Sequence, residues 1–223
     1  KHTIILVTKL HGGQVSSTDT SVTQVHHVHR DDYGSRMGMW LFLFTELILF
    51  GGLFIIYAVY RFTHQQEFHL AAQELNTSVG LLNTIILLTS SMTMAMSITA
   101  IQKNNKKLSL VLVATTILFA FAFMVNKYFE WGAKFHHGIF PGSKELVSRP
   151  DGEILYFGLY FVMTGLHALH VIIGVIILSF NVVFIVRNHI TSTSFVKLEN
   201  AGLYWHLVDL IWIFLFPLFY LIH

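Results

Sequence analysis

Residues Met39–Tyr60 read MWLFLFTELILFGGLFIIYAVY, and this stretch decides the class of fold. A transmembrane helix needs about 20 consecutive, predominantly apolar residues. The stretch is long enough, and Glu46 is its only charged residue. It therefore predicts a helix that spans a membrane.

The composition of the chain supports the same assignment. Of the 223 residues, 54% are hydrophobic and 12% are charged, whereas a soluble domain carries about 25% charged residues. Because the sequence contains no cysteine, it excludes a disulfide framework, a thiolate zinc site, an iron–sulfur cluster and a dinuclear thiolate copper centre within these residues. The net charge of +2, without a long run of Lys or Arg, indicates no nucleic-acid partner.

The remaining apolar segments predict four more spans, and the third is expected to continue as a helix into the headgroup region as far as Lys134. We therefore predict an all-α membrane protein, a bundle of five transmembrane helices at about 37–60, 79–101, 108–126, 154–186 and 203–222.

The distribution of Lys and Arg predicts the orientation. Nine of them lie in the N-terminal segment and in the connections 102–107 and 187–202, and five lie on the other side of the predicted spans. The positive-inside rule then places the N-terminus in the cytoplasm and the C-terminus in the periplasm. The expected organisation is an N-terminal cytoplasmic segment, 1–36, followed by a transmembrane domain, 37–223.

Glu46 is the leading candidate for a functional residue. It lies nine residues into the first predicted span, about 14 Å along a helix and hence near the middle of the membrane. An ionised carboxylate there is costly, so we expect Glu46 to be protonated, paired or turned into the bundle. The sequence leaves two interpretations open: a proton-linked or lipid-contacting carboxyl, and a neutral acid that hydrogen-bonds a neighbouring helix.

Two histidines mark an inward face of the fourth span. His167 and His170 share a narrow sector of the helix with Gly174 and Asn181, at 100° per residue. They are either metal or haem ligands or histidines that hydrogen-bond between helices. A bis-histidine haem formed by His170 would need His206 as its second ligand.

Polar residues on the fifth span form a second candidate cluster. His206 and Asp209 stand three residues apart, and Asp209 shares a face with Trp205 and Trp212. We expect His206 and Asp209 to form a structural pair, with a proton-handling role as the alternative.

Other polar groups lie near the ends of the predicted spans. At the end of the third span, Glu130 and Lys134 are placed to form an i, i+4 ion pair. The histidines 26, 27 and 29 in the N-terminal segment indicate either a transition-metal site or a solvated polar stretch.

Four ordered motifs resemble one known family, subunit III of the haem–copper oxidases. Together they cover the chain from about Arg36 to its end, and their order makes the match specific. They are GMWLFLFTE at 38–46, KYFEW at 127–131 leading to HG at 137–138 and PG at 141–142, TGLHALHVIIG at 164–174, and YWHLVDLIW at 204–212.

The resemblance implies a polytopic subunit with no haem, copper or other metal of its own, bound to catalytic subunit I, which holds the haem–copper centre, and to subunit II. Membrane lipids and a respiratory supercomplex are further implied partners, with bound phospholipid in a cleft. In the family, a carboxyl that matches Glu46 reacts with carbodiimide, and the subunit sustains proton uptake and protects the catalytic subunit during turnover. By position in the motifs, the structural or lipid- and subunit-contact candidates are Glu130, His167, His170, Trp205, His206 and Asp209.

Larger members of the family have two more spans before the one that carries the matching Glu, and the five-span form resembles bacterial members. We therefore expect a non-redox accessory subunit of a proton-pumping terminal oxidase, most simply cytochrome c oxidase, in a bacterial inner membrane. The alternatives are subunit III of a quinol oxidase, a helper associated with nitric-oxide reductase, and a small membrane b-type cytochrome.

Overall fold

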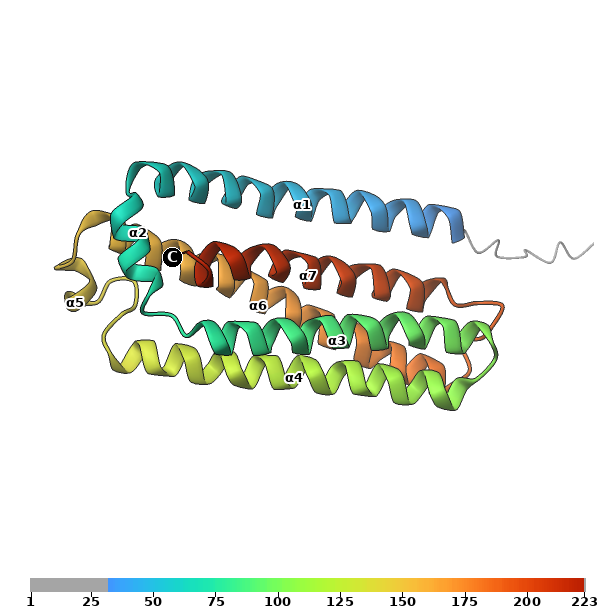
Figure 1. Ribbon diagram of the computed structural model, residues 1–223. Coiled ribbons are helices and arrows are strands. Elements are labelled where there is room, and N and C mark those ends of the chain that lie inside the picture. Colours follow the sequence, from blue (N-terminus) through green and yellow to red (C-terminus); the bar gives the residue numbers. More distant parts are fainter. Residues whose placement is uncertain (1–31, 223) are drawn as a thin grey trace, which may run out of the picture. The chain divides into compact units, whose positions relative to one another are not determined.

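The computed structural model describes residues 32–222, and within that range the regular structure is helical (Figure 1). The only β-type pairing there is an isolated bridge between Thr191 and Ser194. The seven helices are α1 (Asp32–Thr63), α2 (Gln65–Ala72), α3 (Thr77–Gln102), α4 (Lys106–His136), α5 (Lys144–Val147), α6 (Asp151–Val186) and α7 (Val196–Tyr220).

Five of these helices, α1, α3, α4, α6 and α7, are long and apolar enough to cross a membrane. The predicted bundle of five spans is therefore confirmed. The orientation of the chain ends and the boundary at residue 36 remain predictions. The histidines 26, 27 and 29 lie outside the described residues.

Several helices extend beyond the predicted spans. The helix α4 continues to His136, as its sequence indicated, and α7 begins at Val196 rather than near residue 203. In the first turn of α7, Glu199 accepts a hydrogen bond from Arg36 of α1 at 2.8 Å. The short helices α2 and α5 lie in the connections between the predicted spans.

The ends of the helices use polar side chains that satisfy free backbone groups. The Asn76 side chain accepts from the backbone N–H groups of Ser78 and Val79 at the start of α3. Asn105 does the same for Leu108 at the start of α4. The turn between α3 and α4 therefore closes tightly and sets the two helices side by side.

The helix α7 lies at the centre of the bundle. It packs against α1 on one side and against α3 and α6 on the other, and Figure 1 shows it between α1 and α3. Over its most apolar window, α7 is 56% buried, whereas α1 is only 11% buried. The helix α1 is therefore the peripheral element and contacts the rest through α7, α6 and α2.

A glycine allows α6 and α7 to approach closely. A Cβ added at Gly174 would lie 2.8 Å from a ring carbon of Trp205, which is itself buried. No real Cβ contact is that short, so the Trp205 ring can pack there only because residue 174 has no side chain.

We predict that Gly174→Ala destabilises the bundle by about 1–3 kcal/mol, because the added methyl overpacks the α6–α7 contact. The measurement is the midpoint of thermal unfolding in detergent micelles. The matched control is Gly158→Ala on the same helix, where a Cβ would meet nothing within 4 Å. Equal midpoints for the two variants would contradict the prediction.

Candidate functional site

The mid-membrane carboxyl of Glu46 contacts His170 across the α1–α6 interface. The His170 Nε2 and Glu46 Oε2 atoms are 2.9 Å apart, and the two side chains are 9% and 14% exposed. Sequence analysis singled out both residues but did not pair them. The structure therefore brings the leading acid of α1 onto the inward face of α6.

The second ring nitrogen of His170 defines the chemistry of this contact. Nδ1 lies 2.8 Å from the backbone carbonyl oxygen of Leu166. Because a carbonyl oxygen can only accept, Nδ1 carries a hydrogen and donates it. One further proton then lies between Nε2 and the Glu46 carboxyl. The pair is either an imidazolium with a carboxylate or a neutral imidazole with a carboxylic acid, and it has no net charge in both forms.

Aromatic residues hold the Glu46–His170 pair in place. The Phe50 ring packs edge-on against the His170 ring, with centroids 5.4 Å apart. The Tyr204 hydroxyl of α7 donates to the His170 carbonyl oxygen at 3.1 Å. Three helices thus meet at this point. The contact with His170 is the hydrogen bond to a neighbouring helix that one interpretation of Glu46 predicted. The proton-linked role of Glu46 remains a prediction.

His167 occupies a different environment one turn away. It is fully buried, and neither ring nitrogen has a hydrogen-bond partner within residues 32–222. Its ring lies against Trp212 at 5.2 Å and edge-on against Phe123 at 5.7 Å. His167, His170, Gly174 and Asn181 are all buried, which confirms the predicted inward face of this helix.

The predicted pair of His206 with Asp209 does not form in the described part of the chain. His206 Nδ1 instead lies 2.6 Å from the Ser91 hydroxyl of α3. Asp209 is buried, and its Oδ1 atom has no hydrogen-bond partner. The prediction was wrong because α3 packs against α7 and presents a hydroxyl to His206.

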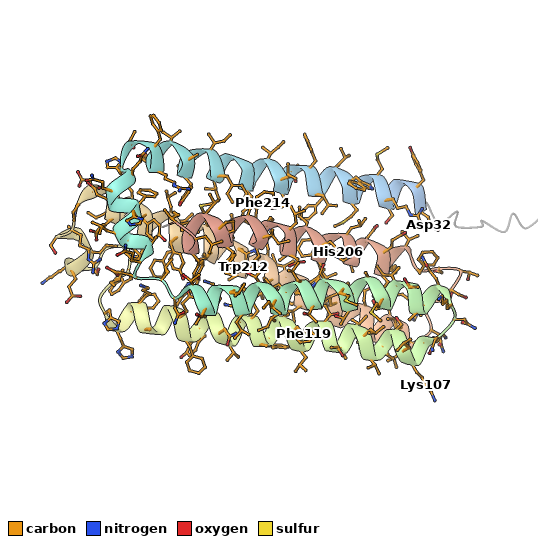
Figure 2. All side chains as sticks on the ribbon, viewed as in Figure 1. Asp32, Lys107, Phe119, His206, Trp212 and Phe214 are labelled. Carbon is orange, nitrogen blue, oxygen red and sulfur yellow. The ribbon has the colours of Figure 1, made fainter. Side chains whose placement is uncertain are left out.

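Two tryptophans of α7 also form hydrogen bonds with α3. Trp205 donates from Nε1 to the Ser90 hydroxyl at 3.1 Å, and Trp212 donates to the Thr84 hydroxyl at 3.1 Å. Figure 2 shows Trp212 and His206 on α7 near its side that faces α3. The Ser- and Thr-rich face of α3 thus serves as a row of hydrogen-bond partners for α7.

A buried ion pair that sequence analysis missed lies between α4, α6 and α7. Lys127 is 3% exposed, and its ammonium lies 3.3 Å from both carboxylate oxygens of Glu130. It also donates to the hydroxyls of Tyr220 at 2.7 Å and Tyr160 at 3.2 Å. Both tyrosines in turn donate to Glu130 Oε1.

Aromatic faces complete the surroundings of Lys127. The ammonium lies 5.0 Å from the Trp212 ring centroid and 5.1 Å from that of Tyr160, within the range of cation–π attraction. The signal in the sequence is the spacing of Thr116, Ala120, Phe123 and Lys127, which places Lys127 on the buried stripe of α4.

The predicted ion pair between Glu130 and Lys134 does not form within residues 32–222, because each side chain has another partner. The Lys134 ammonium donates to the Glu74 carbonyl oxygen at 2.8 Å, while Glu130 is engaged by Lys127. Arg149 bonds the Glu74 carboxylate at 2.5 Å and that of Glu153 at 3.0 Å. The hydrogen bond to Glu74 raises the pKa of the Arg149 guanidinium above its usual value. This network joins the connection after α2 to α4 and α6.

We predict that Lys127→Met destabilises the chain by about 3–5 kcal/mol, because it leaves the Glu130 carboxylate buried without its cation. The double variant Lys127→Met/Glu130→Gln should recover part of that loss. The measurement is the unfolding midpoint in detergent micelles, with the exposed Lys103→Met as the control. A double variant less stable than the single one would contradict the explanation.

Comparison with known proteins gives one family match and three relatives. A family profile described as cytochrome c oxidase subunit III matches residues 3–223. The heme-copper oxidase subunit I+III of Aeropyrum pernix is 31% identical over 195 residues, which cover 84% of this chain and 22% of that protein. The cytochrome c oxidase subunit 3 of Thermostichus vulcanus is 30% identical over 216 residues, covering 94% of this chain and 98% of that one.

A further relative carries a different printed name. The probable quinol oxidase subunit 3 of Staphylococcus saprophyticus is 27% identical over 188 residues, which cover 84% of this chain and 89% of that protein.

Proposed function

The chain belongs to the cytochrome c oxidase subunit III family, and on that premise we propose that it is the accessory subunit of a haem–copper terminal oxidase. The match over residues 3–223 is the observation that carries the proposal. In this role the chain supports the oxidation–reduction carried out by partner subunits that hold haem and copper, and it transfers no electrons itself.

The contacts of His170 fit a role without haem. Its two ring nitrogens face Glu46 and Leu166. To bind haem iron, His170 would have to give up one of these bonds. Within residues 32–222, no group of three or more His, Asp or Glu side chains is arranged to hold a metal ion.

The proposed partners are catalytic subunit I and subunit II, within a multi-pass assembly in a bacterial inner membrane. The fused subunit I+III of Aeropyrum pernix supports contact between the first and third subunits, because one chain carries both names. Cytochrome c is the proposed electron donor of the complex. Quinol is the second candidate, favoured by the relative from Staphylococcus saprophyticus.

Glu46 is the residue that we propose to link this subunit to proton uptake. The proton between Glu46 and His170 can move from one side chain to the other without changing the charge of the pair. A low-dielectric medium opposes a change in net charge far more than a shift of this kind. The shared proton can therefore move within the pair at low cost, and this property supports the proposal.

We predict that Glu46→Gln leaves the haem content of the complex unchanged but reduces the number of turnovers that the complex completes before it is inactivated. The amide keeps the size of the side chain and a hydrogen bond to His170, yet it holds no exchangeable acid proton. The measurement is oxygen consumption followed to inactivation, together with proton uptake on reduction. Asp151→Gln, at the exposed start of α6, is the control. Unaltered lifetime and proton uptake would remove Glu46 from the mechanism.

We also predict that the chain co-purifies in mild detergent with a polypeptide that carries a haem–copper centre. The isolated chain should show no Soret band. A Soret band stoichiometric with this polypeptide alone would overturn the accessory role in favour of a small cytochrome. Oxidation rates with reduced cytochrome c and with quinol then decide the donor.

A further inference from the structure

His167 has a hydrogen-bonding requirement that no group in the described part of the chain meets. The imidazole is completely buried, and both of its nitrogens lack a partner among residues 32–222. In either neutral tautomer the ring carries one N–H donor and one acceptor nitrogen. Buried polar groups in proteins nearly always have a partner, which is either a protein group or ordered water. The ring therefore needs a small molecule that can form hydrogen bonds with it.

A second buried atom without a partner lies on the facing helix α7. Asp209 is 5% exposed, and its Oδ1 atom accepts no hydrogen bond from any residue in the range 32–222. Asp209 precedes Trp212 by three positions. The two side chains therefore share a face of α7 and start about 4.5 Å apart along its axis.

The Trp212 ring brings these two groups together. It packs against the His167 ring, with centroids 5.2 Å apart and planes inclined at 35°. Helical side chains lean toward the N-terminal end of their helix, so the Trp212 ring covers the turn that holds Asp209. The imidazole of α6 and the carboxyl of α7 therefore lie within about one helical turn of each other.

Water is the molecule that fits between the imidazole and the carboxyl. It both donates and accepts hydrogen bonds, as these two groups together require. With a hydrogen bond of about 2.8 Å on each side, one water joins two atoms that lie about 4–5.5 Å apart. A metal ion fits less well, because no three His, Asp or Glu side chains within residues 32–222 are arranged to bind one. The Lys127 ammonium, 5.0 Å from the Trp212 ring, also opposes a second cation at this place.

We propose that at least one internal water molecule bridges the imidazole of His167 and the carboxyl of Asp209. His170, one turn along α6 from His167, already bonds Glu46 of α1. The bridge therefore extends hydrogen bonding from α1 through α6 to α7 in the middle of the membrane. It also makes Asp209 a second buried carboxyl with a partner on α6. The inference depends on the fold and not on the proposed function.

The variant His167→Phe separates this proposal from simple ring packing. A phenyl ring keeps the shape that packs against Trp212 and removes both buried nitrogens. If His167 only fills space, the variant should be at least as stable as the wild type. If His167 shares a water with Asp209, the substitution leaves the carboxyl without its partner and lowers the stability. The double variant His167→Phe/Asp209→Leu removes both polar groups and should recover the loss.

The measurement is the unfolding midpoint of the purified full chain in detergent micelles. We expect His167→Phe and Asp209→Leu each to lower the midpoint by roughly 3–8 °C, and the double variant to lie above both single variants. Such non-additivity measures the coupling between two side chains that make no direct hydrogen bond at these atoms. The control combines His167→Phe with Lys103→Met, an exposed position whose effect should simply add.

A cryo-electron microscopy map of the wild-type complex, at a resolution that shows ordered water, gives a direct test. We expect density for water within hydrogen-bond distance of a His167 nitrogen and of the Asp209 carboxyl. If the single variants do not fold, the map decides alone. If no oxidase subunits co-purify, the unfolding midpoints of the isolated chain decide alone.

Three results would overturn the proposal. The first is a midpoint of His167→Phe equal to or above that of the wild type. The second is additive effects in the double variant. The third is a map in which either side chain bonds a protein group instead of water. Coupling of Asp209→Leu to Ser91→Ala, without coupling to His167→Phe, would identify the Ser91 hydroxyl as the partner of Asp209.

Discussion

The neutralisation of two buried carboxyl groups, those of Glu46 and Glu130, constrains the arrangement of these helices. In hydrocarbon, an unpaired ion costs at least a few kcal/mol, so buried carboxylates need partners on other helices or nearby turns. Glu46 meets His170 of α6, and Glu130 meets Lys127 together with Tyr160 and Tyr220. Each pair is neutral overall, and each fixes the rotation of the helices that supply it.

The two pairs differ in how they can serve function. The Lys127–Glu130 pair is enclosed by hydroxyls and aromatic faces from α6 and α7, so its geometry is fixed from several directions. The Glu46–His170 pair joins the peripheral helix α1 to the bundle and shares a single proton. The first pair is therefore suited to holding the fold, and the second is the one for which we propose a proton-linked role.

The sequence predicted what depends on local pattern and missed what depends on distant partners. Five spans follow from apolar length alone, and the inward face of α6 follows from the spacing of His167, His170 and Gly174. The partners of Lys127 could not be inferred in the same way, because Tyr160 and Tyr220 lie 33 and 93 residues away. The expected His206–Asp209 pair does not form for a related reason, since Ser91 of α3 offers a hydroxyl to His206 from 115 residues away.

The large sequence separation of Glu46 and His170 has a consequence for biogenesis. The helices α3 and α4 are joined by a tight turn and can pair as soon as both are made, whereas α1 must wait for α6. The two partners are 124 residues apart, which corresponds to roughly 6–25 s of synthesis at 5–20 residues per second. During that interval the carboxyl of Glu46 must keep its own proton or stay near water. The free-energy cost of placing Glu46 in the membrane therefore arises during insertion, before the bundle is complete.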